Sequence, residues 1–201
     1  MLKRFKHLFS RPASTSVSED PLRDDDILRD DFSPSTETLD ALAEFVRLVG
    51  SPCGQAEADQ IADSVRTGDL PGDDIAGLLT WSLARNLGDG APWTLAISVD
   101  WKAWDEIEWQ AEKLLDTLGI GARWEWARAE AERTVADGLL DFGAWLRPHG
   151  YELLHVDTGG DDYFAFPIRA DLLQEARLYA ERAGLKIEQA DDFRASQGLS
   201  L

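Results

Sequence analysis

The segment at residues 149–168 constrains the fold of this chain more than any other. Two apolar runs, at 151–156 and 163–168, flank a turn that contains Gly159 and Gly160. Apolar runs of this length bounded by turn residues favour strands, and adjacent glycines can supply the positive φ angles of a tight reversal. The segment therefore predicts a β-hairpin.

Hydrophobic periodicity predicts helices and strands on both sides of this hairpin. Apolar residues at helical spacing predict helices at about 35–50, 55–66 and 72–87, and Ser35 is placed to cap the first. Apolar and small polar residues alternate from Trp93 to Val99, which predicts a strand. The other predicted elements are a long helix after Asp100, a short strand at 123–126, a helix ending at Leu146, a helix at 171–183 and a final strand at 185–187.

This order of elements predicts an α+β fold, with N-terminal helices followed by a small, mostly antiparallel sheet that helices cover on one face. We expect a single α+β domain over residues 35–190. Residues 1–34 are interpreted as a disordered tail and acidic linker, because the segment is rich in Ser, Pro and Asp. Residues 191–201 are expected to be a flexible C-terminal tail.

The first 13 residues combine positive charge with an apolar side, as in an interfacial amphipathic helix. A helix this short is marginal in water, and the acidic linker opposes an anionic surface, so we expect no stable membrane association. Its basic residues are Lys3, Arg4, Lys6 and Arg11, and its apolar residues are Leu2, Phe5, Leu8 and Phe9.

The formal net charge of −18 makes the chain strongly acidic. Such a field repels nucleic acid and accelerates encounters with basic molecules, so we expect a basic protein partner and no nucleic acid. The simpler interpretation is that the charge maintains solubility. Cys53 is the one cysteine in the sequence, which excludes an intrachain disulfide and favours a reducing cytoplasm.

Three stretches together resemble the bacterial DUF6630 family, a family of unknown function. They are the run from Val99 to Gln110, the Leu-Gly-Ile ending at Ile120 and the run from Leu153 to Pro167. The resemblance covers roughly residues 36–190. It implies a cytoplasmic bacterial protein and supplies no catalytic residue.

Acidic residues and a tryptophan in the helix after Asp100 form the first candidate site. Trp101 and Trp104 are expected to pack in the core, whereas Trp109 lies off the apolar stripe and could anchor a protein interface. The predicted partner-binding residues are Asp105, Glu106, Glu108, Trp109 and Glu112.

The hairpin turn carries the second candidate site, with His155, Asp157, Asp161 and Asp162 as possible ligands for a hard divalent cation. The simpler interpretation is that the three carboxylates bond to backbone within the turn, and that His155 lies on the strand face shared with Tyr151 and Leu153. We favour this interpretation and expect no cofactor. His149 is interpreted as a helix-end residue.

These features predict an acidic, non-enzymatic protein-binding module of the bacterial cytoplasm, and the specific form that we favour is an immunity-type protein that neutralises a basic partner. None of the sequence motifs for nucleophilic, zinc-dependent or phosphate-binding catalysis is present in the sequence. The alternative is a metal-dependent enzyme that uses the Asp-rich hairpin turn. A third hypothesis is a module attached to a membrane through the tail. The sequence leaves the oligomeric state open.

Overall fold

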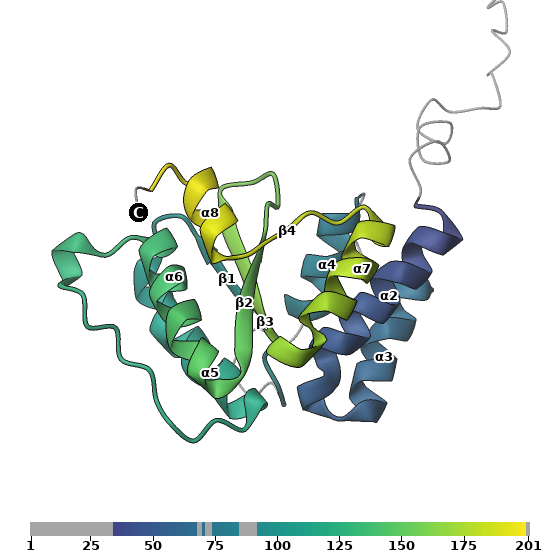
Figure 1. Cartoon of the computed structure of the whole chain (residues 1–201), viewed down its shortest axis with the longest axis horizontal. Helices are drawn as coiled ribbons and strands as arrows, with labels where there is room; N and C mark the ends of the chain where they lie inside the picture. The colour runs from purple at the N-terminus through teal and green to yellow at the C-terminus, as the bar shows by residue number, and fades with distance from the viewer. Residues whose placement is uncertain (1–33, 68–69, 71–73, 85–91, 200–201) are drawn as a thin grey trace, which may run out of the picture. The chain divides into compact units, whose positions relative to one another are not determined.

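A computed structural model describes residues 34–67, 70, 74–84 and 92–199. These residues all belong to one compact unit, residues 33–201, and the fold is α+β as predicted (Figure 1). The N-terminal tail and most of its linker lie outside the described residues. Within the described residues, no helix combines the length and the apolar character needed to cross a bilayer.

An antiparallel sheet of four strands lies at the centre of this fold (Figure 1). The strands are β1 (Ile97–Asp100), β2 (Tyr151–Val156), β3 (Asp162–Arg169) and β4 (Ile187–Glu188), in the order β1-β3-β2-β4. The predicted hairpin is confirmed, since β2 pairs with β3 and places Leu154 opposite Phe166.

The two turn glycines serve different purposes. Gly159 has a positive φ of 73°, as predicted. The φ of Gly160 is not positive, which differs from our expectation. A Cβ atom at Gly160 would lie 2.7 Å from Oδ1 of Asp162, the end of an exposed side chain that would have to move aside.

One face of the sheet, the first face, is covered by α2 (Thr36–Gly50) and α7 (Leu173–Ala183), which contact β3. Helices α3 (Gln55–Arg66) and α4 (Ile75–Ala84) pack on α2 and share the same core. Ser35 caps α2 as predicted, because its hydroxyl accepts a hydrogen bond from the backbone N–H of Thr38 at 3.2 Å. The Phe45 ring of α2 meets the Phe166 ring of β3 edge-on, with 5.7 Å between centroids. Both side chains are fully buried.

The opposite face, the second face, packs against α5 (Ile107–Leu118), α6 (Val135–Leu146) and α8 (Ala190–Ser196). This arrangement corrects the prediction that helices cover one face. Successive residues of a strand point to opposite sides, and in β2 Leu153 and Leu154 are both buried, one in each core. Uninterrupted apolar runs of this kind are typical of strands buried on both faces.

Two further predictions differ from the structure. The strand expected at 123–126 is an irregular segment, because Trp124 and Trp126 pack against the second-face helices and no strand among the described residues pairs with it. The flexible tail expected at 191–201 is largely the helix α8, which Phe193 holds to the sheet through its buried ring.

Short 3-10 helices also occur between these elements. They are η1 (Ser51–Cys53), η2 (Trp104–Glu106), η3 (Glu130–Glu132), η4 (Arg147–His149) and η5 (Ala170–Leu172).

Helix α5 closes the outer edge of β1. The side chain of Gln110 is buried and bonds Ser98 twice: its Oε1 accepts from the backbone N–H at 2.9 Å, and its Nε2 donates to the carbonyl at 3.0 Å. Thr117, two turns along the same helix, accepts from the backbone N–H of Thr94 at 2.8 Å. These side chains satisfy backbone groups that β3 does not reach.

Candidate functional site

The predicted acidic surface forms a groove at the start of α5, which we call the Trp109 groove. It is about 400 Å³ in volume, and its lining residues are Asp105, Glu108, Trp109, Glu112, Arg123 and Trp124. Trp109 is 42% exposed, as expected for a residue off the apolar stripe of the helix. The fifth predicted residue, Glu106, is exposed and lies one residue before the helix.

Glu108 contacts two other residues of the domain. Its Oε1 accepts a hydrogen bond from the backbone N–H of Trp126 at 3.1 Å, and its Oε2 pairs with Nη1 of Arg133 at 3.1 Å. The Arg133 guanidinium also lies over the rings of Trp104 and Trp126, at 5.3 and 4.8 Å from their centroids. Glu108 therefore fixes the segment between α5 and α6, and its charge is already neutralised internally.

The remaining carboxylates of the groove stay accessible. Glu112 is exposed, and its Oε1 lies 3.6 Å from Nε of Arg123. The closer partner of Arg123 is Asp116, at 2.8 Å. No hydrogen bond or ion pair joins the Asp105 side chain to any residue that the structure describes. Asp105 and Glu112 thus place negative charge on either side of the exposed Trp109 ring.

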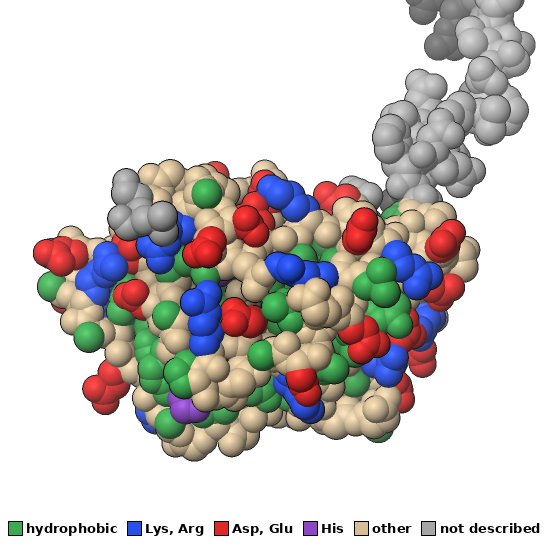
Figure 2. All heavy atoms as spheres, viewed as in Figure 1, with side chains coloured by type: hydrophobic (Ala, Val, Ile, Leu, Met, Phe, Trp, Pro, Cys, Tyr) green, Lys and Arg blue, Asp and Glu red, His purple; other side chains and the backbone are tan. Residues whose placement is uncertain are grey.

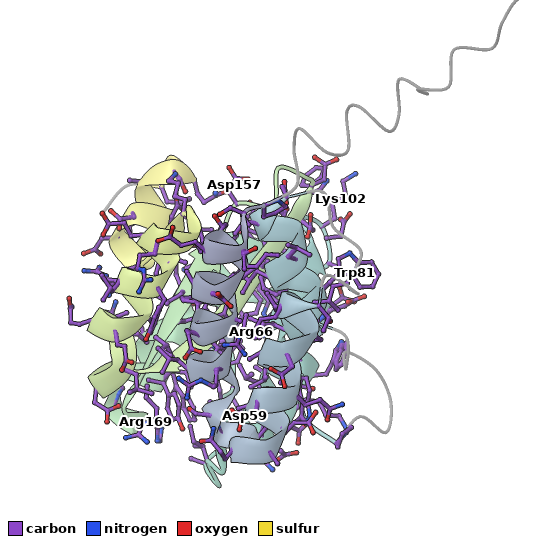
Figure 3. The ribbon with its side chains drawn as sticks, turned by 90° about the vertical axis from the view of Figure 1, so that its right-hand side faces the viewer. Asp59, Arg66, Trp81, Lys102, Asp157 and Arg169 are labelled. Carbon is purple, nitrogen blue, oxygen red and sulfur yellow. The ribbon has the colours of Figure 1, made fainter. Side chains whose placement is uncertain are left out.

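A second hollow, the hairpin cleft, lies between the turn of the hairpin, β4 and α8. Its volume is about 440 Å³. The turn contributes Asp157, Asp161 and Asp162, and the walls include Trp101, Tyr163 and Phe193. Trp101 was expected in the core but is 53% exposed, because its backbone N–H bonds to the Asp161 carbonyl at 3.0 Å and places the residue beyond the end of β1. Asp157 and Lys102 lie at the same end of the domain, opposite Arg169 (Figure 3).

Of the three turn carboxylates, Asp157 bonds to backbone as we favoured from the sequence, Asp162 bonds to a side chain instead, and the Asp161 side chain bonds to no described residue. Oδ1 of Asp157 accepts a hydrogen bond from the backbone N–H of Gly159 at 2.9 Å, and Oδ1 of Asp162 accepts one from the Thr158 hydroxyl at 2.8 Å. Across the described ranges, no three His, Cys, Asp or Glu residues come close enough to hold a metal ion. The structure therefore does not bring His155 and the three aspartates together as a ligand set.

His155 is the unusual group of the cleft. It is 3% exposed, and its ring stacks on that of Phe193 with 3.8 Å between centroids. Within the described part of the chain, its Nδ1 is the one buried side-chain nitrogen or oxygen without a hydrogen-bond partner. Burial lowers the pKa of His155 from 6.5 to about 3, so the imidazole is neutral at physiological pH.

Sequence reasoning missed the residues that β4 and α8 bring to the cleft. Glu188 lies opposite His155 in the strand register and is buried. One oxygen of Glu188 accepts from Lys186 Nζ at 2.7 Å, and the other from the Ser196 hydroxyl at 3.0 Å. Gln197 accepts from the Tyr163 hydroxyl at 2.8 Å. The available signal was Phe193, the one aromatic residue in a segment interpreted as a tail.

Comparison with known proteins identifies the family. A family model described as "Domain of unknown function (DUF6630)" matches residues 41–191, so the chain belongs to this family. No curated protein and no solved structure shows significant similarity to the chain.

Proposed function

Starting from a family without an assigned activity, we propose that this chain is a non-enzymatic module of the bacterial cytoplasm that binds a basic protein through the Trp109 groove. An immunity protein that neutralises a basic toxin is the form of this function that we favour. One observation carries the proposal: an exposed tryptophan lies in a groove between carboxylates.

An arginine side chain of the partner suits this groove. Its methylene groups can pack on the Trp109 ring, while its guanidinium pairs with Asp105 or Glu112. Tryptophan is enriched among the residues that dominate binding energy at protein interfaces. The groove therefore offers both apolar area and charge complementarity to one basic side chain.

The acidic residues outside the Trp109 groove should affect the rate at which the partner associates more than the contacts in the bound complex. On the face seen in Figure 2, acidic and basic side chains are interspersed, so this face presents no uniform acidic patch. The formal net charge of −18 still produces a long-range negative field. Association with a basic partner should accordingly be fast at low salt and slow as ionic strength rises.

The structure contains little that favours an enzyme. Burial raises the pKa of the Cys53 thiol to about 11, which leaves it un-ionised at neutral pH and a poor nucleophile. His155 is buried and neutral, and the described hairpin residues do not converge on a metal position. Among the residues that the structure describes, no specific observation favours the alternative of a metal-dependent enzyme.

The proposal can be tested with a partner recovered from a lysate of the source bacterium and then purified. Trp109→Ala should weaken binding by roughly thirtyfold or more, the effect of losing an interface anchor. Asp105→Lys combined with Glu112→Lys should weaken binding and flatten its salt dependence. Glu108 stays unchanged, because its loss would leave Arg133 without its carboxylate.

The matched control is Glu175→Lys combined with Glu181→Lys on α7, where both residues are exposed. It changes the net charge by the same amount at another site. If the control and the groove variants bind the partner equally well, the Trp109 groove is not the interface. Affinity should be measured by calorimetry at several salt concentrations.

A further inference from the structure

Helix α8 is attached to the rest of the domain by few side chains. It follows β4 and lies beside the hairpin, in contact with β2, β4 and α6 (Figure 1). Among the seven described residues of α8, only Phe193 is buried. The Ser196 hydroxyl donates to Glu188 at 3.0 Å, and Gln197, just after the helix, accepts from the Tyr163 hydroxyl at 2.8 Å. A short helix with so few attachments should open at a lower free energy than the core of the domain.

The contact beneath Phe193 is unfavourable for a polar group. The Phe193 ring stacks face to face on the imidazole of His155, with 3.8 Å between centroids and 0° between the ring planes. His155 is buried, and its Nδ1 has no hydrogen-bond partner among the described residues. A buried nitrogen without a partner lacks the hydrogen bonds that water would supply. Withdrawal of Phe193 would let water reach the imidazole, so the burial of His155 favours opening of α8.

Protonation of His155 is coupled to the position of α8. With the ring covered, burial lowers the pKa of His155 from 6.5 to about 3, because the charged imidazolium is not solvated. With Phe193 withdrawn, one face of the ring would meet water and the pKa should return toward its ordinary value. The open form therefore binds the proton first as the pH falls below about 6.5. Acid should shift the equilibrium toward the open form by up to about tenfold per pH unit.

Imidazole is the side chain that ordinarily titrates between pH 5 and pH 7, whereas carboxyl groups titrate near pH 4 and amines above about pH 10. Glu188 on β4 and Tyr163 on β3 face His155 from the sheet, and burial raises the pKa of the Tyr163 hydroxyl. On the side of α6, Arg147 pairs with Glu152. A dependence between pH 5 and pH 7 would therefore report His155. The other charged groups nearby are the three aspartates of the hairpin turn, Lys186, and Asp191, Asp192 and Arg194 of α8.

We propose that α8 is an acid-sensitive strap, which opens by withdrawing Phe193 from His155 and thereby removes one wall of the hairpin cleft. Phe193 and Ser196 both line that cleft, so opening changes its shape and its accessible surface. Glu188, buried and opposite His155 in the strand register, loses its bond to Ser196 in the same step. The strap is separate from the Trp109 groove and does not depend on the function proposed for that groove.

Native-state hydrogen exchange on the full chain measures the opening of the strap. The probes are the backbone amide of Phe193, which donates to the Gln189 carbonyl at 2.8 Å, and the amide of Val46 in the buried core of α2. The Phe193 amide should be less protected than the Val46 amide at both pH 7 and pH 5. After correction for the intrinsic pH dependence of exchange, the opening constant at Phe193 should rise roughly twentyfold between pH 7 and pH 5.

Three variants distinguish protonation of the histidine from ordinary fraying of the helix. His155→Leu has no imidazole, so its opening constant should be the same at pH 7 and pH 5. Phe193→Ala should raise the pKa of His155 toward 6.5, as measured by NMR titration of the ring. Ala195→Gly, at an exposed position of α8, is the control. It lowers helix propensity and should raise the opening constant by roughly fivefold at both pH values alike.

Several outcomes would overturn the proposal. Equal protection of the Phe193 and Val46 amides would mean that α8 opens only when the whole domain unfolds. An opening constant that is the same at pH 7 and pH 5 in the unmodified chain, or a pH dependence that persists in His155→Leu, would separate the strap from the histidine. An unchanged pKa of His155 in Phe193→Ala would show that the strap does not keep the ring neutral.

Discussion

The two faces of the sheet differ in how they use polar groups. On the first face, helices α2, α3, α4 and α7 pack through aliphatic side chains and the Phe45–Phe166 contact, and Ser82, buried in α4, bonds to the carbonyl of Leu79 in its own helix. On the second face, Gln110 and His155 are buried and Trp104, Trp124, Trp126 and Trp145 pack around the core.

Both candidate sites belong to the second face or to its margins. The Trp109 groove lies on α5, and the hairpin cleft is walled by α8. The first face carries the larger apolar core and should contribute more of the stability, whereas the second face also buries polar groups. Functional sites are commonly built on a rigid scaffold at some cost in stability.

The largest expected effect comes from the apolar core of the first face. Phe166→Ala removes a fully buried ring and should lower the free energy of unfolding by about 3–5 kcal/mol. Urea denaturation measures this change. The control is Leu178→Ala on α7, where the side chain is 54% exposed and the effect should be near zero. A loss below about 1 kcal/mol for Phe166→Ala would contradict the assignment of stability to this face.

A smaller effect on the free energy of unfolding should distinguish Glu108 from Glu112, two carboxylates of the Trp109 groove. Glu108→Gln removes the charge that pairs with Arg133 and should cost at most about 2 kcal/mol, because the Arg133 side chain is 17% exposed whereas the Glu108 side chain, at 41%, is partly screened by solvent. Glu112→Gln should cost almost nothing, since its contact with Arg123 is longer and more exposed. Equal losses in thermal or urea unfolding would mean that Glu108 has no special structural role.

The pH dependence of stability tests the buried histidine. Its folded pKa of about 3 lies below the ordinary 6.5, so the unfolded chain binds the proton first as the pH falls. The stability contributed by neutral His155 is therefore complete above pH 6.5 and is lost below it, at about 1.4 kcal/mol per pH unit. Between pH 7 and pH 5, the unmodified chain should lose about 2 kcal/mol more than His155→Leu. Parallel pH profiles for the two proteins would show that His155 is not held neutral.

The smallest expected effect tests whether the helices on the two faces of the sheet unfold in one transition. Ser35 caps α2 on the first face and Thr134 caps α6 on the second, each by accepting a backbone N–H. Substitution of either by alanine should cost about 1 kcal/mol. In a single cooperative unit, both losses appear in one transition seen by every probe. A loss that affects only tryptophan fluorescence for Thr134→Ala would separate the second face as its own unit.

The hairpin, the helix beginning at Ser35 and the α+β class could be predicted because their signals are local. Turn glycines, a capping serine and hydrophobic periodicity act within a few residues. The inward role of Glu108 could not be predicted, since its partner Arg133 is distant in sequence and the intervening chain is irregular. The hairpin cleft could not be predicted from the sequence either. Helix α8 is short, and Phe193 lies against His155 only in the tertiary fold.

Gln110 has a consequence beyond the domain's own folding. β1 is an outer strand, and an outer strand with unpaired backbone groups can recruit the same strand from another molecule into a growing fibre. The side-chain amide of Gln110 occupies the two groups of Ser98 that such a strand would use. We therefore expect this side chain to disfavour edge-to-edge pairing along β1, a process whose rate grows with protein concentration.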